Sequence, residues 1–166
     1  MMSMILSSIL NYSIKIENPF LYMTKAEVVK QIIPKHQGVI EKTVSCWRAS
    51  RVSHQYHHCG ICVPCLVRRI ALENNSIDLQ EYQTDLLRTD VVRLDPDNDG
   101  KRNLVELCEF INTFHENCSI AKMQEKFPEL VTEYFDAGRT VEMYRRFANE
   151  ALAVLNQYPE VAKLMG

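Results

Sequence analysis

The chain has 166 residues, of which 46% are hydrophobic and 24% charged, and its formal net charge at pH 7 is −2. This composition excludes a disordered or fibrous protein, and the small net charge gives no signal for nucleic-acid binding. Residues 1–10 are apolar, but they lack the basic start of a secretory signal and are too short to span a bilayer. We therefore expect a cytoplasmic globular protein that does not enter a membrane.

Two helices and a short strand are predicted ahead of a cysteine-rich segment. Residues 1–11 favour a short apolar helix, which would normally be covered by a preceding segment or a partner. The alternation over residues 13–17 suits a strand. Thr24 and Glu27 have the spacing of a capping box, so a second helix begins there and is expected to end at Pro34.

Four cysteines have the spacing of a structural metal site. Cys59, Cys62 and Cys65 lie three residues apart, and Cys46 lies thirteen residues upstream of the first. Each C-x-x-C pair directs two thiolates at one centre, and four thiolates give the tetrahedral set that zinc prefers. An iron–sulfur cluster is the main rival, but no further cysteine and proline follow shortly downstream as in ferredoxin-type runs. We predict Zn²⁺ bound by these four cysteines.

Histidines and arginines near the four cysteines allow more than one interpretation of the site. His54, His57 and His58 are near enough in the sequence to replace one ligand. Arg68 and Arg69 follow on a predicted helix. Three interpretations are open: they are solvated charges, they screen the anionic metal–thiolate centre, or they hold a phosphate or carboxylate.

Residues 74–166 predict a mainly helical segment. Apolar residues recur at helical spacing over 104–114 and again over 141–155, and a short turn is expected after Pro159. Cys108 and Cys118 stand alone in this context and are interpreted as core residues.

An acidic stretch in this half, residues 95–106, fits the calcium-loop pattern D-x-D-x-D-G-x5-E. A calcium loop needs a helix running into it, whereas residues 91–94 favour a β conformation and Pro96 disfavours a helix. We interpret the stretch as an acidic turn in which Asp or Asn caps the following helix, without high affinity for calcium.

Residues 18–29 (N-P-F-L-Y-M-T-K-A-E-V-V), the pair Ser45-Cys46 and residues 59–69 (C-G-I-C-V-P-C-L-V-R-R) together resemble a known family. They look like the C-terminal half of QueC, 7-cyano-7-deazaguanine synthase, and of its relatives among the PP-loop ATP pyrophosphatases. The resemblance covers roughly residues 11–72. It extends in particular to the QueC-like component, QatC, of the Qat anti-phage defence systems. In that family the S-C…C-G-x-C-x-x-C motif binds zinc.

The resemblance implies a mainly α fold with one or two short strands. Residues 1–73 would be a truncated end of the PP-loop domain carrying the four-cysteine zinc motif, and residues 74–166 a helical tail packed on it. The family's S-G-G-x-D-S loop, whose backbone amides hold the ATP phosphates, does not occur in these 166 residues. We therefore assign no catalytic residue and no nucleotide-binding residue in this chain.

Two functions are implied. The first is a zinc-binding module, inactive alone, that works with a PP-loop-containing chain or with other defence-system proteins. The second is an ATP-dependent ligase of the 7-cyano-7-deazaguanine synthase type, which binds ATP only when a partner chain supplies the loop.

Overall fold

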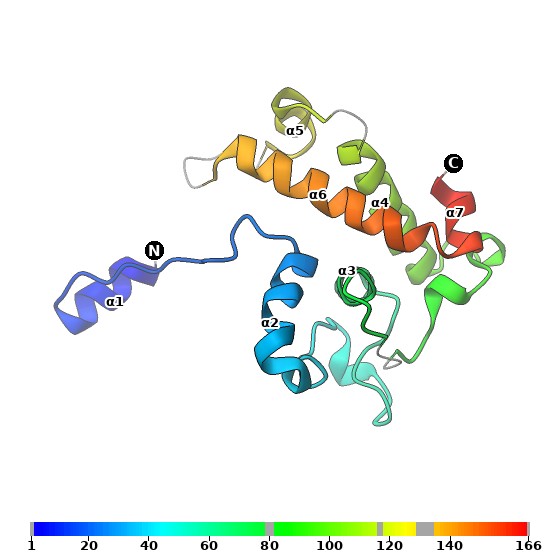
Figure 1. The fold of residues 1–166 in the computed structure, drawn as a ribbon, viewed down its shortest axis with the longest axis horizontal. Coiled ribbons are helices and arrows are strands. Elements are labelled where there is room, and N and C mark those ends of the chain that lie inside the picture. The colour runs from blue at the N-terminus through cyan, green and yellow to red at the C-terminus, as the bar shows by residue number, and fades with distance from the viewer. Residues whose placement is uncertain (1, 79–81, 116–117, 129–134, 166) are drawn as a thin grey trace.

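The computed structural model describes residues 2–78, 82–115, 118–128 and 135–165, and these residues are mainly helical (Figure 1). The helices are α1 (Met2–Leu10), α2 (Lys25–Ile40), α3 (Val63–Glu73), α4 (Asp99–His115), α5 (Ile120–Lys126), α6 (Ala137–Leu155) and α7 (Pro159–Met165). Three single 3₁₀ turns accompany them: η1 (Ala49–Arg51), η2 (Leu86–Arg88) and η3 (Val91–Arg93). The expectation of a mainly α protein is confirmed.

No β-sheet forms within the described residues, and the strand predicted over residues 13–17 is absent. Instead of joining a strand, the backbone N–H of Ile14 donates to the Ser7 hydroxyl at 2.8 Å, so this segment folds back on α1. Among the described residues one isolated parallel bridge, between His58 and Tyr82, is the only β pairing.

α2 begins as predicted but continues beyond Pro34. The Thr24 hydroxyl accepts from the N–H of Glu27, and the Glu27 carboxylate accepts from the N–H of Thr24, which completes the capping box. The helix is interrupted at His36, where φ is −146°, and resumes to Ile40. Because Ile40 is buried against α3, packing holds the chain in a second helical segment after the proline.

Three predictions for the second half are corrected by the fold. Residues 91–93 form η3 and not a β conformation, because Val91 turns into the core. α4 starts at Asp99, five residues before the predicted 104, since the Asn98 side chain accepts from the N–H groups of Gly100 and Lys101. The chain after Pro159 is the helix α7 and not a short turn.

The main core lies between α4 and α6 and extends to α3 and α7. Its centre is aromatic: the Phe110 ring lies 4.6 Å from that of Phe114 and 5.1 Å from that of Tyr144, measured between centroids. α3 links this core to α2, because Leu66 and Ile70 pack in the main core whereas Leu72 packs against α2. The same helix carries Cys65 of the cysteine-rich segment.

α1 and the chain that follows it project away from the rest of the molecule (Figure 1). Met4, Ile9 and Tyr12 are 73%, 70% and 62% exposed, so the apolar residues of this arm, residues 2–17, are largely uncovered. Within the part of the chain that the structure describes, no helix has both the length and the apolar character needed to cross a membrane.

Candidate metal centre

A glycine turn positions Cys59. Gly60 adopts φ +80°, and a Cβ at this position would lie 1.9 Å from the backbone oxygen of Thr84. The N–H of Thr84 donates to the carbonyl of Cys59 at 3.1 Å, so the two segments run close together. Because only glycine combines this left-handed conformation with such a close approach, the turn that presents Cys59 requires it.

The next two cysteines lie at the start of α3. Cys62 is the N-cap residue, and its carbonyl accepts from the N–H groups of Cys65 and Leu66 at 2.9 and 3.1 Å. Pro64 lies in the first turn, where a missing N–H costs no helical hydrogen bond. The positive end of the helix dipole favours thiolates at this place.

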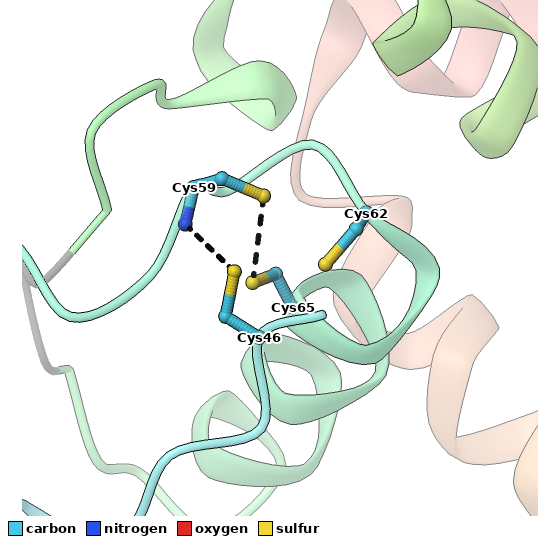
Figure 2. A group of neighbouring side chains, drawn as sticks. All are labelled: Cys46, Cys59, Cys62 and Cys65. Carbon is cyan, nitrogen blue, oxygen red and sulfur yellow. Dashed lines mark hydrogen bonds between the residues drawn. The ribbon is translucent and has the colours of Figure 1, made fainter. Parts of the chain in front are cut away.

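The sulfurs of Cys46, Cys59, Cys62 and Cys65 converge, with all ligand atoms within 4.8 Å of one another (Figure 2). The Sγ atoms of Cys59 and Cys65 are 3.9 Å apart, and none of the four thiols is in a disulfide. Zn–S bonds of about 2.3 Å in a tetrahedron place sulfurs roughly 3.8 Å apart. The spacing of this pair therefore suits a metal ion at the centre.

Burial disfavours charged thiolates in this cluster when no metal is bound. All four cysteines are buried, and burial raises the pKa of the Cys65 and Cys62 thiols. Burial acts in the same direction on Cys59, but the N–H groups of Ile61 and Cys62 outweigh it and lower the pKa of that thiol. A divalent cation resolves the conflict, because it stabilises several buried thiolates at once.

The histidines separate into one buried and two exposed residues. His58 is fully buried and its Nδ1 lies 4.0 Å from the Cys65 sulfur, whereas His54 and His57 are exposed. Burial and the nearby Arg68 lower the pKa of His58 to about 4, so its ring is neutral at pH 7. Among the described residues, the cluster of potential ligands consists of the four cysteines without a histidine.

The two arginines that follow have different surroundings. Neither is solvated: Arg68 is 3% and Arg69 7% exposed. Arg69 pairs with Glu73 at 2.7 Å and with Asp85. Arg68 instead points back towards the segment before Cys46, where its guanidinium donates to the Thr43 hydroxyl at 2.6 Å. The interpretation as solvated charges is therefore wrong for both, whereas screening of the metal centre is not tested by their burial.

The acidic stretch, residues 95–106, forms a turn before α4 and the first two turns of that helix, which begins at Asp99. Asp95 accepts from the N–H of Asp97 at 2.8 Å, and Asp99 pairs with Arg48 at 2.5 Å and with Arg102 at 2.7 Å. These contacts fit the predicted capping turn. They also connect it to the metal centre, because the backbone N–H of Arg48 donates to the Cys46 sulfur at 3.3 Å.

Cys108 and Cys118 lie in the main core, as interpreted from the sequence. Burial raises the pKa of Cys108 to about 11.

Lys25 is a residue of this site that was not singled out by its position in the sequence. Its ammonium donates to the Ser45 hydroxyl at 2.9 Å, although the two residues are twenty positions apart. Nothing in the local pattern distinguishes Lys25 from an ordinary solvated helix residue.

Comparison with known proteins finds a family match to the N-terminal part of this chain. Residues 1–76 match the model of the family described as queuosine biosynthesis protein QueC. No curated protein and no solved structure matches the chain. The matched residues contain all four clustered cysteines, so the expected resemblance to the zinc-binding part of QueC-like proteins is confirmed.

Proposed function

We propose, from the QueC-like character of residues 1–76, that this chain is a zinc-binding module in which Cys46, Cys59, Cys62 and Cys65 hold one Zn²⁺. The convergence of four buried sulfurs within 4.8 Å carries the proposal. Four thiolates fill a tetrahedral site and leave no position for water or substrate, which is typical of structural zinc. The ion would stabilise the fold by joining the loop at Cys46 to α3.

Elemental analysis of the full chain, purified untagged and without chelators, tests this proposal. We expect about one zinc per chain, because four preorganised thiolates bind zinc far more tightly than other abundant divalent ions except copper. Iron with the visible absorption of an iron–sulfur cluster, or a metal-free protein that is equally stable with and without added zinc, would contradict it.

We further propose that the module acts in the cytoplasm with a second chain that carries the PP-loop. The reducing compartment keeps the thiols available to metal. The uncovered arm, residues 2–17, supports a partner: residues 1–14 contain no charged side chain, and Met4, Ile5, Ile9 and Leu10 are exposed. Contiguous apolar surface of this kind is typical of an interface.

We propose the substrate class from the resemblance of residues 1–76 to QueC. A completed protein would be an ATP-dependent ligase acting on a 7-deazapurine, or a QatC-like component of anti-phage defence. The long helical segment α4–α7 after the cysteines favours the defence type, which has a similar tail. The module itself would help the completed protein to fold and would provide a surface on which the partner chain docks.

Without a partner, the chain is expected to release no pyrophosphate from ATP above a no-protein control. Adenylation depends on groups positioned around the phosphates, and the S-G-G-x-D-S loop that holds them does not occur in the 166 residues. A coupled pyrophosphate assay with ATP and a 7-deazapurine carboxylate measures this.

The control in this assay is the Cys62→Ser variant purified in parallel, which reports contaminating ATPases. Pyrophosphate release by the wild-type chain that exceeds the variant's and persists through further purification would overturn the proposal of an inactive module.

A further inference from the structure

The segment that delivers Cys46 to the metal centre has little regular structure of its own. Residues 41–44 are exposed and lie after the end of α2. Cys46 is thirteen residues from Cys59, whereas the other three cysteines share one turn and the start of α3. Its position therefore depends on contacts from outside the segment.

Two cationic side chains make these contacts. Lys25, in the first turn of α2, donates from its ammonium to the hydroxyl of Ser45 at 2.9 Å. Arg68, one turn beyond Cys65 on α3, donates to the Thr43 hydroxyl at 2.6 Å and to the Ile40 carbonyl at 2.8 Å. Together they attach the residues that precede Cys46 to both neighbouring helices.

The charge of Lys25 complements the centre. Four thiolates and one Zn²⁺ carry a net charge of about −2, and a buried dianion is costly without nearby cations. Lys25 has no ion pair with a carboxylate among the described residues, whereas Arg48 pairs with Asp99. Burial and the nearby Arg68 lower the pKa of Lys25, and its ammonium bonds to Ser45, the residue that directly precedes the ligand Cys46.

We propose that Lys25 is a positioning residue of the metal centre: together with Arg68 it fastens residues 40–46, and its positive charge offsets part of the charge of the metal tetrathiolate. The inference rests on the proposed zinc site and adds a charge-compensating layer around it.

Zinc affinity measured by chelator competition tests the proposal. Lys25→Met is expected to weaken zinc binding roughly 10- to 100-fold, the range found when outer-shell partners of metal ligands are removed. Lys30→Met, an exposed lysine on the same helix, should bind zinc as the wild type does. Because Arg68 is almost fully buried and its removal risks unfolding, Lys25 is the informative position.

Two further variants separate charge compensation from general stability. Lys25→Arg should restore most of the affinity, and Ser45→Ala, which removes the hydrogen-bond partner but not the charge, should weaken binding only a few-fold. The absorption of the cobalt-substituted protein should keep its tetrahedral thiolate bands in every variant. Failure of the arginine variant to restore affinity would contradict the role of charge.

The two proposals fail in different ways. A wild-type chain that binds no zinc would overturn the metal site itself. A wild-type chain with one zinc, together with a Lys25→Met variant of unchanged affinity, would overturn only the role of Lys25.

Discussion

The Cys62→Ser variant is expected to lose zinc and to melt at least about 10 °C below the wild type. Loss of a structural metal costs several kcal/mol, and 1 kcal/mol corresponds to roughly 2–4 °C in a protein of this size. The effect cannot come from a weaker helix start, because Cys62 is the N-cap of α3 and serine is a preferred N-cap residue. Differential scanning calorimetry with parallel zinc analysis measures both losses.

Cys108→Ser is the matched control, because Cys108 is as buried as Cys62, at 2% and 3% exposure, but lies in the main core. Placing a hydroxyl there should cost about 1–2 kcal/mol without changing the zinc content. A chelator should lower the melting temperature of the wild type and of Cys108→Ser but leave Cys62→Ser unchanged. Equal losses in both variants, with zinc retained in both, would argue against the metal site.

The four cysteines were identifiable from the sequence because their chemistry is tied to local spacing. Cys59, Cys62 and Cys65 are brought together by one glycine turn and one helix start, and both are determined by neighbouring residues. The contacts of Lys25 and Arg68 were not identifiable in this way. They join residues twenty or more positions apart, and nothing in a helical pattern shows where a long cationic side chain ends.

The errors in secondary structure have the same origin. A local pattern predicted a strand at residues 13–17 and a helix end at Pro34, but a strand needs a pairing partner and a helix end depends on packing. Ile14 bonds back to the Ser7 side chain instead of a neighbouring strand. Ile40 is buried against α3, and this packing continues α2 beyond the proline.

Arg69 connects α3 to the C-terminal part of the chain. Its guanidinium donates to Glu73 at 2.7 Å, to Asp85 and to the Tyr158 hydroxyl at 3.1 Å. The Tyr158 hydroxyl in turn donates to Glu73 at 2.7 Å. The side chains of Arg69 and Glu73 are 8% and 17% exposed, so this pair is largely withdrawn from water, whereas Asp85 is 39% exposed.

Arg69→Met should therefore destabilise the protein by about 2–4 kcal/mol, because it leaves the Glu73 carboxylate buried without its cation. The estimate lies below that for a fully buried pair, since Asp85 is partly solvated and Glu73 keeps the Tyr158 hydroxyl. The matched control is Arg88→Met, which removes an exposed partner of the same Asp85 at 3.6 Å and should cost less than about 0.5 kcal/mol. Urea unfolding of zinc-loaded protein gives both values. The zinc content of Arg69→Met should stay at the wild-type level, because within the described part of the chain the hydrogen bonds of Arg69 go to Glu73, Asp85 and Tyr158. If the two arginine variants unfold at the same urea concentration, the Arg69 network does not hold α3 to the C-terminal helices.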